Sequence, residues 1–357
     1  MPKTTADCPF ALGIFSVAGA PPFIGLVKDE SVIALDALRP LCKQLGVLLP
    51  QASDLFELLQ DWPTAIDALQ AAVSALNVKS DLAGSTLEMF VPVSELKIHA
   101  PLDRPRQVLC TGANYFRHVV DMIVAGGGDG TPETAGMSPQ ALREHAENLM
   151  RERARSGSPY AFSKPAATIT GPNDPIVLPP HAEQPDWELE LAVVIGKSAR
   201  HVSREQALEY VAGYTIANDI TNRDHIWRKD DMKALGTDWI ASKSSPTYLP
   251  LGPYIVPAMF IEDPQDLHIS LKLNGEVKQD ERTSDMIFDV ARQIEYLSSM
   301  VKLHPGDIIC TGSPAGNGIH YKRFLRHGDV IESAISGLGK QRNHCINEHS
   351  AGEKKDD

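Results

Sequence analysis

The chain has 357 residues, of which 43% are hydrophobic and 22% are charged, and its formal net charge at pH 7 is −12. This composition is typical of a globular protein with a large core, and the acidic balance argues against nucleic acid as a partner, since phosphates require clusters of Lys and Arg. No apolar run approaches the ~20 residues that span a bilayer, and the N-terminus lacks an export signal. Five scattered cysteines without metal-ligand spacing favour a reducing compartment, so we predict a cytoplasmic protein that binds neither nucleic acid nor membranes.

The first hundred residues predict a small unit of strands and helix. Apolar segments at 12–17, 23–27 and 31–35 alternate with turn residues and indicate three short strands, and leucines at helical spacing over 53–76 indicate a helix. Residues 92–105 are extended and rich in proline, and we interpret them as a linker. We therefore expect three parts, which are an N-terminal domain over 1–100, a main domain over 101–345 and a disordered, charged tail over 346–357.

The main domain is predicted to contain mostly strands, together with a few helices. A first strand over 107–110 is followed by a helix that begins at Pro139 with Ser138 as its N-cap and ends before Gly157. Further helices are predicted over 204–211, where Ser203 and Gln206 have capping-box spacing, and over 287–301.

Two segments of the main domain have the same ending. Residues 108–112 and 308–312 are both apolar strands that end in Cys-Thr-Gly. Glycine at a strand end lets the backbone approach a ligand closely. The alternative interpretation is two ordinary transitions from strand to turn.

The most informative segment is Glu188-Leu189-Glu190, which leads into an apolar run. Side chains alternate along a strand, so the two glutamates share one face while Leu189 lies on the other. Two carboxylates beside a buried run repel each other and lose hydration, and a divalent cation between them relieves both effects. The alternative is a half-exposed strand whose polar face holds two glutamates.

A third carboxylate, Asp219, follows the strand-like segment 214–218. If this strand is a neighbour of the Glu188 strand, Asp219 completes a site of three carboxylates. Because no His or Cys lies beside these acids, the pattern favours Mg²⁺, Mn²⁺ or Ca²⁺ over Zn²⁺, with positions left for water and a chelating substrate. Arg223 either meets a substrate carboxylate or forms a surface ion pair.

A second group of candidates contains groups that transfer or stabilise charge. His118 and Asp121 are three positions apart, so a helix places them near one another, and a carboxylate beside imidazole is the arrangement of a general base. Lys164 and Lys243 lie in non-helical, partly apolar contexts, where an ammonium stabilises an enolate or oxyanion. The alternatives are a structural histidine and two surface lysines.

Taken together and in order, these groups resemble the fumarylacetoacetate hydrolase family over residues 105–340. Six blocks carry the resemblance: Asn114-Tyr115-x-x-His118, Phe162-Ser163-Lys164-Pro165, Glu188-x-Glu190, Asp219-x-x-x-Arg223, Lys243-Ser244 and Pro305-Gly306-Asp307-x-x-x-Thr311-Gly312-Ser313-Pro314. Such a resemblance implies an α+β, mostly β fold, with a mixed β-roll C-terminal domain after the small N-terminal domain, and it implies a homodimer.

The resemblance also implies an assignment of roles. Glu188, Glu190 and Asp219 hold Mg²⁺, Mn²⁺ or Ca²⁺, and a small 2-oxo acid chelates that metal. His118, with Asp121, activates the water that attacks the distal carbonyl, and Lys243 stabilises the enolate that leaves. The implied substrate contacts are Tyr115, Lys164, Arg223 and Thr311.

The expected activity is hydrolysis of a carbon–carbon bond in an acylpyruvate-like 2,4-diketo acid, within the catabolism of aromatic or sugar-derived keto acids. The alternatives are a decarboxylase, hydratase or tautomerase of 2-oxo acids on the same metal site, and a catalytically silent scaffold. Asp121 stands where small family members have glutamate, so another acid is an alternative partner for His118. The segment 122–158 is longer than in small members and is either a lid over the substrate or a surface excursion.

Overall fold

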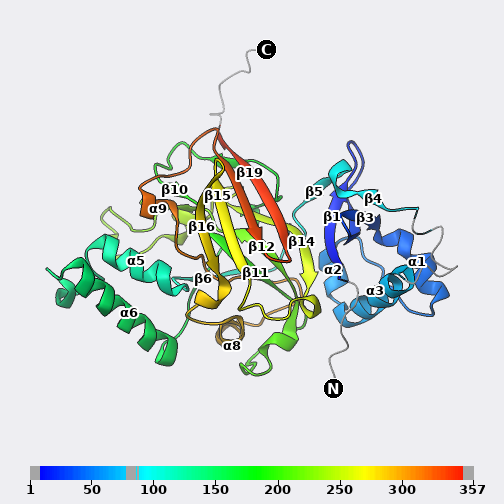
Figure 1. Ribbon diagram of the computed structural model, residues 1–357, viewed down its shortest axis with the longest axis horizontal. Coiled ribbons are helices and arrows are strands. Elements are labelled where there is room, and N and C mark those ends of the chain that lie inside the picture. Colours follow the sequence, from blue (N-terminus) through cyan, green and yellow to red (C-terminus); the bar gives the residue numbers. More distant parts are fainter. Residues whose placement is uncertain (1–8, 78–85, 87, 349–357) are drawn as a thin grey trace, which may run out of the picture.

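The computed structural model describes residues 9–77, 86 and 88–348 (Figure 1). The N-terminal elements are β1 (Ala11–Ser16), β2 (Phe23–Lys28), β3 (Ser31–Ala34), α1 (Leu35–Gln44), α2 (Leu55–Leu59), α3 (Trp62–Asn77), β4 (Val91–Pro92) and β5 (Lys97–His99). The later strands are β6 (Val108–Gly112), β7 (Tyr160–Ser163), β8 (Ile169–Thr170), β9 (Ile176–Leu178), β10 (Pro185–Asp186), β11 (Leu189–Ile195), β12 (Val211–Asn218), β13 (Thr221–Asn222), β14 (Leu249–Pro257), β15 (His268–Leu273), β16 (Glu276–Arg282), β17 (Ile308–Cys310), β18 (Val330–Ile335) and β19 (Gly339–Asn347). The later helices are α5 (Phe116–Gly126), α6 (Pro139–Ser156), α7 (Trp239–Lys243), α8 (Val290–Met300) and α9 (Gly318–Tyr321).

Two large sheets form the framework. The main sheet has the order β4-β3-β2-β1-β14-β12-β11-β17-β6-β7, and the second has the order β16-β15-β18-β19-β9. The N-terminal strands continue the main sheet, because β1 pairs with β14 through Leu12 and Ile255. In Figure 1 the N-terminal strands and α1–α3 lie on one side of the molecule, and α5 and α6 project from the other. The fold is α+β.

The centre of the main sheet is covered on both faces. Every residue of β11 and β12 is buried, and most of these residues are apolar, as expected for strands that are covered on both faces. Leu191 and Val193 pack in one core with residues of the second sheet such as Ile269, whereas Ala192 and Val194 pack in the core that contains the helices α1–α3. Successive side chains of β11 therefore pack alternately into two cores, which hold the strand in place.

Several expected elements are confirmed. The three N-terminal strands form, and α6 begins at Pro139 with the Ser138 side chain accepting a hydrogen bond from the Ala141 amide. The helix predicted over 287–301 begins later, at Val290, because Asp289 caps it.

Other predictions need correction. The helix predicted over 204–211 is wrong, because only Ala207–Tyr210 forms a single 3₁₀ turn, which is sufficient to connect two antiparallel strands. The helical region 53–76 is divided into α2 and α3. The proposed linker 92–105 contains β5, which pairs with β1. Ile346 and Asn347 of the proposed tail end β19, whereas the rest of that tail after Glu348, like Cys8, lies outside the described residues.

The segment 122–158 forms most of a helical hairpin at one edge of the structure (Figure 1). Val120 of α5 packs against Ala146 and Met150 of α6, and this cluster rests on Ile287 and Phe288. Among the residues that the structure describes, no helix has both the length and the apolar character needed to cross a membrane.

Candidate metal centre

Two neighbouring strands bring the three predicted acids together. β11 pairs antiparallel with β12, with Leu189 opposite Asn218, so Glu188 and Glu190 lie beside the residue that follows β12, Asp219. One carboxylate oxygen from each acid lies within 4.8 Å of the others, and all three residues are buried. The strand that contains Glu190 and the strand that precedes Asp219 are therefore neighbours, as the predicted three-acid site required.

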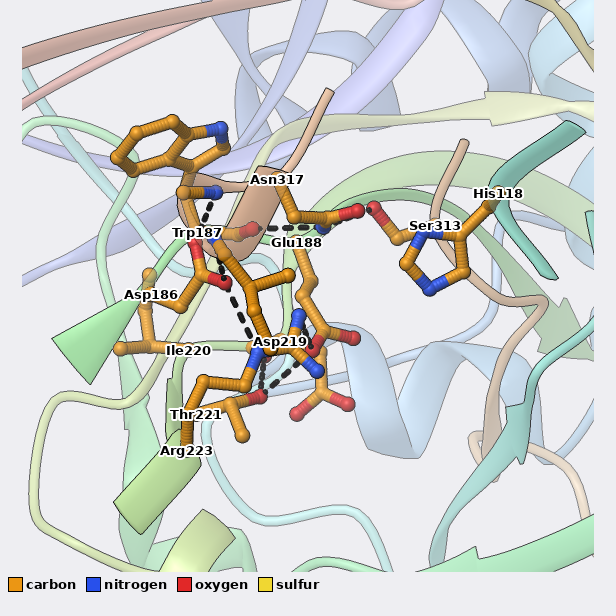
Figure 2. A network of polar contacts seen from close by, with 12 residues as sticks. His118, Asp186, Trp187, Glu188, Asp219, Ile220, Thr221, Arg223, Ser313 and Asn317 are labelled. Atoms are coloured by element: carbon orange, nitrogen blue, oxygen red, sulfur yellow. Dashed lines mark hydrogen bonds and ion pairs between the residues drawn. The ribbon is translucent and has the colours of Figure 1, made fainter. Parts of the chain in front are cut away.

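Cationic side chains surround two of these acids. The Lys164 ammonium lies 2.5 Å from Oδ1 of Asp219, and the Lys243 ammonium lies 2.5 Å from Oδ2. The Arg223 guanidinium is 2.6 Å from Oε1 of Glu188, which also accepts a hydrogen bond of 2.9 Å from the Thr221 hydroxyl. Figure 2 shows Glu188 between Arg223 and Thr221 on one side and His118 on the other. Although burial opposes it, Arg223 and then Lys243 lower the pKa of Glu188 to about 2.

Glu190 has different surroundings. Its Oε2 accepts a hydrogen bond of 2.7 Å from the Gly312 amide, just after β17, and no cation lies within ion-pair distance among the described residues. Burial, followed by the nearby Cys310 and Asp219, raises its pKa well above the ordinary value. Glu190 is the carboxylate of this site that lacks a positive partner.

The shared Cys-Thr-Gly endings meet at this site. β6 and β17 pair in parallel, with Cys110 opposite Cys310, so both endings lie at the same edge of the sheet. Gly312 has a φ of 98°, a left-handed conformation that favours glycine, and a Cβ there would approach that of Asn114 to 2.8 Å. The two strand ends form one wall of the site, and the Gly312 amide contacts an acid directly.

The donor set fits a divalent cation. Four buried carboxylates (Asp186, Glu188, Glu190 and Asp219) face three buried cations (Lys164, Lys243 and Arg223), which leaves one negative charge in excess. The excess lies at Glu190, next to the position where the three acids converge. Oxygen-only ligands of this kind suit Mg²⁺, Mn²⁺ or Ca²⁺.

A cavity of about 620 Å³ opens on the acids. The polar residues that line it are Thr111, His118, Asp129, Glu188, Glu190, Asp219, Arg223, Thr237, Lys243 and Ser313. Aliphatic and aromatic side chains make up most of the remaining lining, and they come from α5, β7, α7 and the loop before α7. The cavity therefore combines a charged end with an apolar region.

His118 faces this cavity from α5, but not in the expected pairing. Its Nδ1 lies 3.3 Å from Nε2 of His320 on α9. Asp121 instead bonds to Arg143 of α6 at 2.8 Å, while His118 stays buried beside the cavity. Burial, and then the charge of Arg223, lowers the pKa of His118 to about 3.

The implied substrate contacts divide into two groups. Arg223 lines the cavity, although it also holds Asp186 at 2.8 Å. Lys164 is directed to Asp219 and to the Ile220 carbonyl, and it is not part of the cavity lining.

Two further implied contacts also lie outside the lining. The Thr311 hydroxyl donates to the Leu191 carbonyl at 2.8 Å. Tyr115, fully buried at the start of α5, pairs with Met286 through its backbone. In this structure the lysine contacts an acid of the site, the threonine bonds to a carbonyl of β11, and the tyrosine is buried.

Sequence reasoning did not identify several residues of the site. His320 belongs to the four-residue helix α9, which has no periodic pattern to indicate it. Thr111 lines the cavity, and its buried hydroxyl has no hydrogen-bond partner. The Cys-Thr-Gly repeat was a signal that could have identified Thr111. Trp239 also lines the cavity, but it begins the five-residue helix α7, which is too short to show a periodic pattern.

Comparison with known proteins agrees with this geometry. The family model described as fumarylacetoacetate (FAA) hydrolase C-terminal matches residues 107–346. Oxaloacetate tautomerase FAHD2A, mitochondrial, from Homo sapiens is 37% identical over 278 residues, which are 77% of this chain and 77% of that protein. The corresponding protein from Rattus norvegicus, Fahd2a, is 34% identical over the same share of each chain.

Solved structures show the same fold. Fumarylacetoacetate hydrolase from Exiguobacterium antarcticum is 26% identical with a TM-score of 0.66, and the match covers 95% of this chain and 100% of that one. Maleylpyruvate hydrolase from Sphingobium, crystallised with manganese(II) ion and pyruvate, is 23% identical with a TM-score of 0.65 over the same shares. The matched family model, the relatives and the arrangement of acids lead to one conclusion: the chain belongs to the fumarylacetoacetate hydrolase family.

Proposed function

We propose that this protein is a divalent-metal-dependent enzyme that interconverts the keto and enol forms of a 2-oxo acid with a second carbonyl carbon at C4. The C3 protons of such an acid are flanked by two carbonyl groups, so they are acidic enough for a histidine to remove. The observation that carries this proposal is the contact between His118 and His320, in place of a contact between His118 and a carboxylate. Support comes from relatives named oxaloacetate tautomerase at 34–37% identity.

The residues around the cavity have separate proposed roles. Glu188, Glu190 and Asp219 are proposed to hold the cation, which when bound would polarise the 2-oxo group and offset negative charge that develops on its oxygen. His118, buried and neutral, accepts the proton from C3. His320 holds the other ring nitrogen of His118. The proton that His118 takes from C3 is delivered to a carbonyl oxygen of the substrate to give the enol, and it moves back to C3 in the reverse reaction.

Two further groups face the reacting atoms. Lys243 adds a positive charge beside Asp219, where the substrate oxygens would lie. The unpartnered Thr111 hydroxyl is free to donate a hydrogen bond to the substrate. Both groups stabilise a negatively charged oxygen without changing the carbon skeleton.

Hydrolysis of the C3–C4 bond is the second candidate. In that reaction water adds to the C4 carbonyl, the C3–C4 bond breaks, C3 takes up a proton, and a carboxylic acid and a shorter 2-oxo acid are formed. The position of His118 in the cavity favours it, since the same nitrogen would accept the proton of water. Support also comes from the hydrolase from Exiguobacterium antarcticum. The absence of a carboxylate in contact with His118 among the described residues makes it the weaker candidate.

One experiment separates the candidates. Oxaloacetate, acetylpyruvate and benzoylpyruvate, with Mg²⁺ or Mn²⁺, are followed by the ultraviolet absorbance of the enol and by product mass. A tautomerase accelerates enol decay without a new mass, a hydrolase releases acetate from acetylpyruvate, and a decarboxylase releases carbon dioxide from oxaloacetate. If oxaloacetate, acetylpyruvate and benzoylpyruvate all change no faster with the enzyme than without it, the proposed function is wrong and a silent scaffold remains. Equal turnover by His118→Asn and the wild type would instead exclude His118 as the base.

The cellular setting is inferred in the same way. The four described cysteines are buried and free, which fits a reducing compartment, and we retain the cytoplasm as the proposed location although the mammalian relatives are named mitochondrial. We also retain a homodimer and a role in catabolism of keto acids as proposals. Cell fractionation and light scattering test the location and the assembly.

A further inference from the structure

The apolar region of the cavity restricts the substrate beyond C4. We propose that the substrate bears an apolar, aryl-sized group on its C4 carbonyl and no carboxylate at that end. This inference rests on the proposed function, because the metal-binding end of the substrate is assigned there. It separates the substrate from oxaloacetate, in which C4 is itself a carboxylate carbon.

A continuous aromatic wall leads away from the acids. The Lys243 ammonium lies 5.3 Å from the centre of the Phe162 ring, so the wall begins at the charged end. Phe162 stacks on Trp239 with ring centres 4.6 Å apart and an angle of 10°, and Trp239 contacts Tyr160 at 5.9 Å. Lys243 is 3% exposed and Tyr160 is 44% exposed, so the wall runs from the interior to the surface. A flat ring is the group that best covers such a surface.

A second part of the cavity lining is aliphatic. Val119, Met122 and Ile123 of α5 line the cavity next to His118, and all three are partly exposed. They are separated by one to four positions, so one side of the helix carries His118 and then this apolar strip. Thioether and aliphatic side chains adapt to an apolar group but offer no hydrogen bond. A substrate whose C3 lies at His118 therefore extends between this strip and the aromatic wall.

The charges along the cavity oppose a second carboxylate. Arg223 and Lys243 are the Arg and Lys residues among its described lining, and both are already paired with acids of the metal centre. The acidic residue outside that centre is Asp129, which is held by Thr131, Thr134 and His145. Hydrogen bonds from Thr131 lower the pKa of Asp129, so it stays charged. A distal carboxylate would therefore meet an anion and aromatic faces.

The size of the cavity agrees with this. About 620 Å³ is within the ~300–1,000 Å³ of pockets that enclose drug-sized ligands, whereas a four-carbon diacid fills only a fraction of it. The unfilled part is the apolar part, so a small diacid would leave aromatic surface in contact with water.

The test compares two ligands that differ in one group. 2-Oxo-4-phenylbutanoate and its 4-carboxyphenyl analogue keep the metal-binding end and the aryl group but have a methylene in place of the C4 carbonyl, so they serve as substrate analogues. They are titrated into the enzyme with Mg²⁺, and binding is followed by calorimetry and by tryptophan fluorescence. We expect the phenyl compound to bind at least about tenfold more tightly, as an apolar pocket discriminates against an unpaired charge. Equal or tighter binding of the carboxylated compound overturns the inference.

Variants locate the effect. Trp239→Ala should weaken binding of the phenyl compound by about tenfold and leave the affinity for pyruvate within about twofold of the wild type. Trp239→Leu is a second variant in case the first does not fold. Asp129→Asn should improve binding of the carboxylated compound alone. Met300→Ala, an exposed apolar position at the end of α8 and outside the cavity, is the control. Unchanged affinities in both Trp239 variants contradict the assignment of the aromatic wall.

Pyruvate separates the two proposals. Pyruvate carries the metal-binding end alone, so its Mg²⁺-dependent binding tests the proposed function. If pyruvate binds and the phenyl compound shows no preference over its analogue, only the apolar specificity is wrong. If neither pyruvate nor the aryl compounds bind, both proposals are wrong.

Discussion

His118 on α5 and His320 on α9 meet through Nδ1 and Nε2 at 3.3 Å, with their rings nearly perpendicular at 75°. Burial lowers the pKa of both imidazoles, so the two rings are neutral at pH 7 and share one hydrogen bond. This contact replaces the carboxylate–imidazole pair that the spacing of His118 and Asp121 suggested. It connects a helix near the start of the region that matches the family model with one near its end.

The histidine contact predicts unequal effects of three substitutions. His118→Asn should lower kcat by about 10²–10⁴, the usual loss of a general base. His320→Asn should lower kcat less and shift the pH profile, because it removes the partner and not the base. Asp121→Asn should change kcat less than about threefold, since Asp121 contacts Arg143. Steady-state kinetics from pH 5 to 9 check these expectations. A large loss of kcat in Asp121→Asn alone would support the His118–Asp121 pair that the sequence suggested.

The uncompensated Glu190 predicts opposite effects on metal binding and on stability. Glu190→Gln should weaken Mg²⁺ or Mn²⁺ binding more than about 100-fold, because outer-shell changes alone cost about 10–100-fold. The same variant should be at least as stable as the wild type in EDTA, since burial disfavours the charged form of Glu190. Calorimetry and urea unfolding measure the two effects, and Glu262→Gln, at an exposed position, is the matched control.

Removal of the metal has its own expected result. EDTA should abolish turnover and lower the melting temperature, and added Mg²⁺ should restore both, because an ion that binds only the folded state stabilises it. Full activity after exhaustive chelation would contradict the assignment of Glu188, Glu190 and Asp219.

Burial of His118 predicts how stability depends on pH. Its pKa of about 3 in the folded state lies below the ordinary value of 6.5, so the unfolded state binds more protons between these values. The free energy of unfolding should therefore fall as pH falls from 6.5 towards 3, by at most about 1.4 kcal/mol per pH unit from this group. Urea unfolding in EDTA should show a smaller loss for His118→Asn, and the same loss as the wild type for His344→Asn at an exposed position.

The two lysines on Asp219 predict a separation of stability from catalysis. Lys164 lies outside the cavity and Lys243 lines it. Lys164→Met should reduce the free energy of unfolding by about 3 kcal/mol, the cost of breaking a buried ion pair, and change kcat of the metal-saturated enzyme less than about tenfold. Lys243→Met should reduce kcat by at least about 100-fold as well. Similar losses of kcat in both variants would contradict this division.

The sequence predicts the acids of the site well because strand alternation is a local rule. Glu188 and Glu190 flank one residue, and the buried run after them fixes the face on which they lie. The helix α6 is equally local, since Ser138 and Pro139 mark its start and Gly157 its end. Such signals need no knowledge of what packs against the element.

The remaining residues depend on packing between distant segments. Nothing near Asp121 in the sequence shows that Arg143 of α6 is its partner. His320 reaches the cavity from a single helical turn, which has too few residues to show periodicity. Whether Thr111 or Thr311 faces the cavity depends on the pairing of β6, β11 and β17. Tertiary contacts decide these cases, so sequence patterns alone could not.

The hydrogen bond from Gly312 to Glu190 joins residues 122 positions apart, and it has a consequence for biosynthesis. A nascent chain that ends between Asp219 and Ile308 already contains all three acids but lacks both β17 and the Gly312 amide that follows it. The candidate metal centre is therefore completed only after Gly312 has been synthesised. A chain that stops before Gly312 would keep the three acids without the amide that contacts Glu190, so we expect it to bind a divalent ion more weakly than the full chain.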